Sequence, residues 1–260
     1  MGHVIDPLYA VSGLAVGLLV GMTGVGGGSL MTPLLVLVFG IHPSTAVGTD
    51  LLYAAATKSV GTGVHNSRGT IDWRIVGRLA LGSVPATAIT LLILSRMNAH
   101  LDARHGVVSM TLGVALILTA ASILFRRLIL DRFTRYSRKW NPRTIAVSTV
   151  VLGAVLGVLV SISSVGAGAI GMTVLLVLYP SLPVNKLVGS DIAHAVPLTL
   201  IAGFGHWLMG SVNLGLLGSL LAGSIPGIII GSLLAARASE RVLRPILAST
   251  LVIVGGRLIF

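Results

Sequence analysis

The sequence contains no cysteine. This absence excludes a disulfide framework, thiolate chemistry and cysteine-ligated zinc, and it gives no information about the redox compartment. Charged residues are also scarce, at 10% of the chain, whereas a soluble domain carries roughly 25%. The composition therefore argues against a soluble domain.

Apolar residues and glycine are abundant instead. Hydrophobic residues make up 54% of the chain, the mean hydropathy is +0.98 and there are 33 glycines. These values predict an all-helical multi-pass protein of the cell membrane with the lipid bilayer as its partner. The net charge is +11, but lysine and arginine lie between apolar segments rather than along one face. We therefore interpret them as topology signals and expect no nucleic acid partner.

Apolar segments occur at approximately 7–23, 28–39, 45–63, 75–95, 104–125, 144–163, 168–179, 187–208, 214–236 and 243–259. Segments near 20 residues can cross a hydrocarbon core of about 30 Å as helices. Segments 28–39 and 168–179 are too short to cross alone, so each is half of a discontinuous crossing or one arm of a re-entrant hairpin. Residues 1–6 lack a basic signal-peptide region, so we expect segment 7–23 to belong to the mature fold.

Each short segment follows a glycine cluster, and the clusters belong to a repeat of about 140 residues. The first cluster is Gly24-Val25-Gly26-Gly27-Gly28-Ser29 and the second is Ser164-Val165-Gly166-Ala167-Gly168-Ala169. With one single-residue gap, Val47 to Pro85 then aligns with Val188 to Pro226. Such a repeat predicts two halves that bring two interrupted helices together near the middle of the bilayer. We expect repeats at 1–125 and 144–260, joined by a basic cytoplasmic linker at 126–143.

Charge placement favours an inverted arrangement of these halves. If each glycine-broken hairpin returns to the side it came from, each half has three full crossings plus one hairpin, which makes about eight membrane segments in all. Because three is an odd number of crossings, the two halves are then inverted relative to one another. Lysine and arginine then divide 15 to 3 between the two sides, but 12 to 6 if the halves are parallel. Short cytoplasmic loops collect basic residues, so we expect inverted repeats with the linker in the cytoplasm. A basic run of this kind also suits an anchor for lipid headgroups.

The motifs resemble those of the TauE/SafE family of sulfite exporters over nearly the whole chain. They are Gly24-Val25-Gly26-Gly27-Gly28-Ser29-Leu30-Met31-Thr32-Pro33, Gly48-Thr49-Asp50-Leu51, Gly69-Thr70-Ile71-Asp72-Trp73, Gly82-Ser83-Val84-Pro85, Gly189-Ser190-Asp191-Ile192-Ala193-His194-Ala195-Val196-Pro197 and Gly223-Ser224-Ile225-Pro226-Gly227. The resemblance implies a membrane permease for small anions such as sulfite, sulfoacetate and related sulfur or carboxylate anions. One departure is Asn213, which stands where the first half has Asp72.

The glycine breaks independently favour anion binding. A helix that restarts after a break presents unpaired backbone N–H groups and the positive end of its dipole. We therefore expect substrate contacts at both breaks, from the residues Thr23, Gly26, Gly27, Gly28, Ser29, Ser163, Ser164, Gly166, Gly168 and Ala169. The alternative interpretation is that these small residues only allow close helix packing.

Ionisable residues inside apolar segments are the next candidates, because burial of such groups is costly unless they are paired or functional. Asp50 and Asp191 are equivalent in the repeat, and each either couples a proton or cation or accepts backbone bonds near a helix start. Lys58 either extends to the membrane surface or supplies a positive charge for the anion. His194 and His206 suit proton coupling, and the alternative interpretation is that each only satisfies a hydrogen bond at a helix end.

Enzymatic functions are poorly supported. Gly24 to Gly28 is not followed by Gly-Lys-Ser/Thr, and no Gly-x-Ser-x-Gly context surrounds an intramembrane serine. We expect no catalytic residue, cofactor or metal. The sequence predicts export of a small anion, sulfite or an organosulfonate such as sulfoacetate, with a passive anion channel as the alternative. It leaves open a coupling proton or cation and a homo-oligomer.

Overall fold

The structure, a computed structural model, describes residues 6–23, 28–96, 101–137, 139–234 and 252. All regular secondary structure in these residues is helical. The helices are α1 (Pro7–Thr23), α2 (Gly28–Leu37), α3 (Pro43–Ser67), α4 (Trp73–Arg96), α5 (Leu101–Leu124), α6 (Arg126–Ser137), α7 (Pro142–Ser163), α8 (Ala169–Leu178), α9 (Val184–Leu208) and α10 (Leu214–Leu234). The predicted all-helical class is confirmed. As expected from the sequence, the segments after the glycine clusters, α2 and α8, are short.

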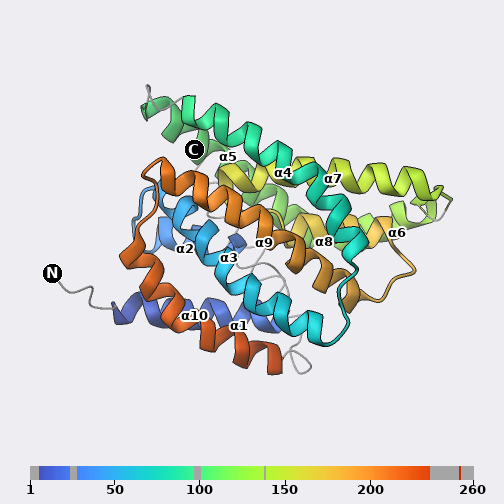
Figure 1. Ribbon diagram of the computed structural model, residues 1–260, viewed down its shortest axis with the longest axis horizontal. Coiled ribbons are helices and arrows are strands. Elements are labelled where there is room, and N and C mark those ends of the chain that lie inside the picture. The colour runs from blue at the N-terminus through green and yellow to red at the C-terminus, as the bar shows by residue number, and fades with distance from the viewer. Residues whose placement is uncertain (1–5, 24–27, 97–100, 138, 235–251, 253–260) are drawn as a thin grey trace.

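Three helix pairs form the framework, and each joins the two halves of the chain. Figure 1 shows α1 beside α10 along one edge, α3 beside α9 in the middle, and α4 beside α7 along the opposite edge. Glycine allows the outer pairs to approach closely, because a Cβ at Gly13 would collide with the Leu220 carbonyl and one at Gly153 with the Leu79 carbonyl. These two contacts are equivalent in the repeat. The duplicated sequence therefore produces duplicated packing.

The central helices α3 and α9 run antiparallel. A Cβ at Gly48, near the start of α3, would meet the carbonyl of Ser211, just beyond the end of α9. In the equivalent contact, a Cβ at Gly189, near the start of α9, would meet the carbonyl of Thr70, just beyond the end of α3. Each helix start thus lies against the end of its repeat counterpart.

Reciprocal hydrogen bonds fix the same pairing. The backbone N–H of Asp72 donates to Ser190 Oγ at 2.8 Å, and that of Asn213 donates to Thr49 Oγ1 at 3.1 Å. Asp72 and Asn213 also occupy equivalent N-cap positions, because each Oδ1 accepts an N–H three residues later. The Asp-to-Asn difference between the halves therefore leaves the cap intact.

Four described helices are long and apolar enough to cross a membrane: α4, α7, α9 and α10. The α5–α6 pair adds a fifth span if it is counted as one bent span. This is fewer than the eight segments predicted. Helices α1 and α8 are apolar but shorter, and α3 has sufficient length at 25 residues but carries Asp50 and Lys58 inside it. Residues 243–259, predicted as the last segment, lie outside the described residues except for position 252.

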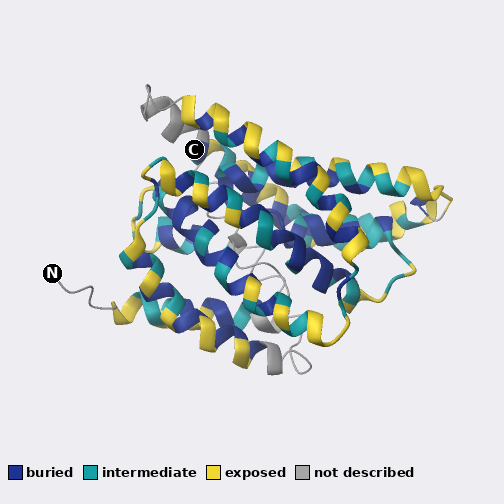
Figure 2. Cartoon of the chain, in the orientation of Figure 1, coloured by how far each residue is buried: buried dark blue, intermediate teal, exposed yellow. Residues whose placement is uncertain are grey.

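Burial follows the pattern of a protein surrounded by lipid. Figure 2 shows buried residues concentrated along α3 and α9, with exposed residues along the outer sides of α4 and α10. The exposed residues of α4 include large apolar side chains, among them Leu81 and Ile89. Such surfaces are unfavourable in water but suit contact with acyl chains. The polar centre of the protein is thus enclosed by helices that face lipid.

The basic segment 126–143 contains a helix of its own. Helix α6 occupies Arg126–Ser137 and is bent by 75° relative to the described part of α5, Val108–Leu124. It packs against α8. The predicted linker is therefore a structured connection between the two halves.

Candidate substrate and coupling site

The second glycine break separates α7 from α8. Helix α7 ends at Ser163 and α8 begins at Ala169. Ser164 has φ 58° and Gly166 has φ 114°, both in the left-handed region that favours glycine. The chain therefore reverses its course within a few buried residues.

This break exposes backbone donors to the protein interior. The Val165 N–H bonds to Ser163 Oγ at 3.2 Å. Within the described part of the chain, no acceptor meets the backbone N–H groups from Gly166 to Ala169, and no side chain caps α8. All of these residues are buried. A buried helix start with unpaired N–H groups is suited to an anion.

The first break is described at its two ends. Thr23 is the last residue of α1, and Gly28 and Ser29 are the first two of α2. Gly26 and Gly27 lie outside the described residues. The prediction of substrate contacts at this break therefore stays a prediction.

Asp50 connects the two halves. It is fully buried on α3, and its Oδ2 accepts hydrogen bonds from the hydroxyls of Ser164, at 3.0 Å, and Thr32. Ser164 begins the second break and Thr32 lies on α2, so one carboxylate contacts both glycine-broken hairpins. Thr32 was not identified from the sequence, although it aligns with Thr173 in the repeat.

The equivalent Asp191 has a different environment. It is buried on α9 with Oδ1 facing Gly171, where an added Cβ would lie 2.9 Å from this oxygen. Among the described residues, Asp191 Oδ1 has no hydrogen-bond partner. Thr173 donates instead to the Ala169 carbonyl at 2.8 Å and accepts from Ser122. The two aspartates are therefore equivalent in sequence but not in contacts.

Neither aspartate caps its own helix. Asp50 and Asp191 lie two turns inside α3 and α9, which begin at Pro43 and Val184. Asp50 interacts with the backbone N–H of Thr32 near the start of α2, so the interpretation of the aspartates as acceptors of backbone bonds stays open beside the coupling role.

Lys58 lies between the aspartates on the α3–α9 interface. Its side chain is 5% exposed and interacts electrostatically with Asp191 and Asp50, and also with His194. The repeat places Thr199 at the equivalent position, where its hydroxyl donates to Ala195 of its own helix. The alternative that Lys58 extends to the membrane surface is therefore wrong. Within the described residues, it is the one buried lysine or arginine.

The two histidines are held by other helices. His194 Nε2 lies 2.9 Å from Ser83 Oγ of α4. His206 Nε2 lies 2.8 Å from the Ser161 carbonyl of α7, and because a carbonyl only accepts, this nitrogen carries the hydrogen. Ser161 is in the last turn of α7, where carbonyls lack helical partners. His206 thus braces the helix that ends at the second break.

The serine hydroxyls near this break already have acceptors. Ser163 Oγ donates to the Leu159 carbonyl at 2.7 Å, and Ser164 Oγ donates to Asp50. The backbone, rather than these hydroxyls, supplies the free donors here. A substrate bond from Ser164 would require Asp50 to release it.

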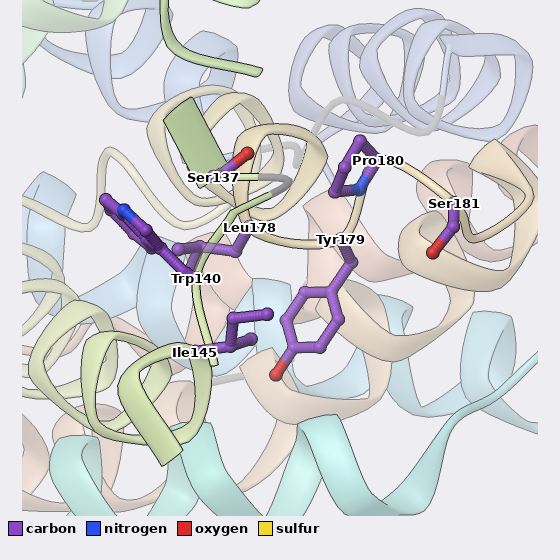
Figure 3. A pocket seen from close by; sticks show the side chains of 7 residues that line it. All are labelled: Ser137, Trp140, Ile145, Leu178, Tyr179, Pro180 and Ser181. Carbon is purple, nitrogen blue, oxygen red and sulfur yellow. The ribbon is translucent and has the colours of Figure 1, made fainter. Parts of the chain in front are cut away.

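A pocket of about 440 Å³ lies elsewhere, at the other end of α8. Its lining residues are Ser137, Trp140, Ile145, Leu178, Tyr179, Pro180 and Ser181 (Figure 3). The Tyr179 hydroxyl accepts from Arg78 Nη1 at 3.1 Å and lies 2.8 Å from Thr149 Oγ1. These bonds tie the end of α8 to α4 and α7. The sequence offered no signal for them, because the three residues lie in unrelated motifs.

Comparison with known proteins identifies this architecture. A family model described as "Sulfite exporter TauE/SafE" matches residues 9–258. The chain belongs to the TauE/SafE family. The resemblance seen in the sequence motifs is thereby confirmed, and the protein is a multi-pass membrane protein of a transporter family, located in the cell membrane.

Two similar curated proteins come from Bacillus subtilis (strain 168). The "Probable membrane transporter protein YjnA" is 42% identical over 253 residues, which cover 95% of this chain and 97% of the relative. The "Probable membrane transporter protein YdhB" is 30% identical over 214 residues, 79% of this chain and 80% of the relative. No solved structure gave a significant match.

Proposed function

We propose that this protein exports a small anion, sulfite or an organosulfonate such as sulfoacetate. The description of the family model supports this substrate class. The observation that carries the proposal is the buried Lys58 between two repeat-related aspartates. A charge buried in a membrane protein is costly unless it is paired or functional.

The proposed binding site combines Lys58 with the N–H groups of the glycine breaks. We propose contacts from Gly26 to Ser29 and from Gly166 to Ala169. Backbone donors and one cation attract an oxyanion, while the carboxylates of Asp50 and Asp191 limit how tightly it is held. A transport site must release its substrate, so a moderate net positive field is more suitable than several fixed cations. Asp50, Asp191, His194 and His206 are the proposed groups for a coupling proton.

The proposed membrane arrangement is a pair of inverted repeats. The antiparallel course of α3 and α9 supports it, because equivalent crossings of inverted halves run in opposite directions. The basic linker, including α6, then lies in the cytoplasm. The glycine breaks of the two halves face one another near the middle of the bilayer.

The test is transport by the purified protein in sealed vesicles. Uptake of sulfite, sulfoacetate, sulfate, acetate and chloride is measured with and without an imposed pH gradient. We expect saturable uptake of sulfite or sulfoacetate and loss of at least about 90% of it in Lys58→Thr, since one buried ionic contact contributes about 1.5–3 kcal/mol. Lys186→Thr removes a half-buried lysine at the start of α9 and serves as the control.

Three outcomes would contradict the proposal. Non-saturable flux would indicate a channel. If neither sulfite nor sulfoacetate is taken up, the proposed substrate class is wrong. If Lys58→Thr takes up substrate as fast as the wild type does, Lys58 is not part of the site.

A further inference from the structure

Helix α6 leaves the membrane domain at a sharp angle. It is bent by 75° from the described part of α5, with which it forms a candidate bent span. Membrane helices tilt on average by about 20° from the bilayer normal. A 75° bend at the end of such a helix directs α6 close to the plane of the membrane surface.

The outward face of α6 is basic. Arg132 and Arg135 lie on the same helix face as Leu128, and Lys139 follows the helix end. These four residues line one groove of about 780 Å³, together with Tyr136 and one acidic residue, Asp131. All six are exposed.

Apolar side chains accompany these charges. Leu128 is 65% exposed, Tyr136 62% and Phe133 54%. Trp140, between α6 and α7, is also exposed. Basic side chains mixed with exposed aromatic and aliphatic side chains on one short helix are typical of helices that lie in the membrane interface. The opposite side of α6 is occupied, since Ser137 is buried and the helix packs against α8.

We propose that this outward face of α6, with Lys139, binds the headgroups of anionic phospholipids. The paired arginines suit phosphate, because guanidinium groups donate parallel hydrogen bonds to its oxygens. The apolar side chains favour a lipid surface over nucleic acid or an acidic protein, as they would enter the boundary between headgroups and acyl chains. The proposal is independent of which anion the protein transports.

Tryptophan fluorescence provides the test on the intact protein. With Trp73 and Trp207 replaced by phenylalanine, Trp140 remains as the single tryptophan, next to the groove. The protein is placed in phosphatidylcholine vesicles containing either brominated phosphatidylcholine or brominated phosphatidylglycerol, whose bromines quench nearby tryptophan. We expect phosphatidylglycerol to occupy the neighbourhood of Trp140 at least about fivefold more strongly, since even one basic side chain near an anionic surface contributes about 1 kcal/mol.

The control compares equal losses of charge. Arg132→Gln/Arg135→Gln/Lys139→Gln should abolish this preference, whereas Arg68→Gln/Arg74→Gln/Arg96→Gln, at exposed positions outside the groove lining, should retain it. In the parent protein, 0.5 M NaCl should reduce the preference because it screens exposed charges. Equal quenching by the two lipids, a preference unaffected by salt, or a preference retained without the α6 charges would each overturn the proposal.

Discussion

The hydroxyl of Ser164 donates a hydrogen bond to the carboxylate of Asp50 at 3.0 Å, although the two residues are 114 positions apart. Asp50 belongs to the first repeat, and Ser164 begins the glycine break of the second. The same carboxylate oxygen accepts from Thr32 on α2. A change in the charge of Asp50 would therefore alter its hydrogen bonds to both hairpins.

The first prediction concerns the charge of Asp50. Asp50→Asn retains an oxygen that accepts from Ser164 and Thr32 but removes the negative charge beside Lys58. We expect substrate binding to persist and the response to a pH gradient to disappear. Gradient-driven uptake is measured beside binding affinity, with Asp191→Asn as the repeat counterpart. If both variants respond to the gradient as the wild type does, the aspartate pair takes no part in coupling.

The second prediction separates the two equivalent threonines. Thr32→Val keeps the shape of the side chain but removes the donor to Asp50, and we expect roughly tenfold slower transport because bonds to charged groups contribute about 1.5–3 kcal/mol. Thr173→Val removes two bonds, one to the Ala169 carbonyl of its own helix and one from Ser122. We expect transport within about twofold of wild type, because both lost bonds join neutral groups and neither involves Asp50 or Lys58. Equal losses in initial uptake rate would show that the Thr32–Asp50 contact has no special role.

The third prediction concerns the packing of α3 against α9. Gly48→Ala and Gly189→Ala place a Cβ against a backbone carbonyl, so each should destabilise the protein by about 1–3 kcal/mol. Gly63→Ala and Gly77→Ala have no neighbour within 4 Å of the new Cβ and should be neutral or slightly stabilising, because alanine favours helix. Thermal unfolding in detergent measures the difference. Similar melting temperatures for all four variants would contradict the close approach.

The fourth prediction concerns the topology. The chain has no cysteine, so single cysteines introduced at exposed positions report their side of the membrane. Ser181 and Leu214 are exposed and flank the two ends of α9. We expect Ser181→Cys to react with a membrane-impermeant reagent from the cytoplasmic side and Leu214→Cys from the outside. Reaction of Ser181→Cys from the outside only, or of Leu214→Cys from the cytoplasmic side only, would overturn the inverted arrangement.

The sequence by itself determined the class of protein, the duplication and the family. Each of these depends on patterns along the chain: apolar length, the recurrence of glycine, and motifs such as Gly48-Thr49-Asp50 with Gly189-Ser190-Asp191. The repeat also identified Asp50 and Asp191 as an equivalent pair, and Lys58 became a candidate because ionisable residues are rare in apolar segments.

Only the tertiary structure decided what these residues contact. The alignment makes Asp50 and Asp191 equivalent, yet only Asp50 bonds to Ser164 of the opposite repeat. The tertiary structure also placed Lys58 in the interior rather than at the surface, because α9 packs antiparallel along α3 and brings Asp191 near Lys58. Contacts across more than a hundred residues depend on how helices pack, and local sequence patterns carry no information about which equivalent residue will find a partner.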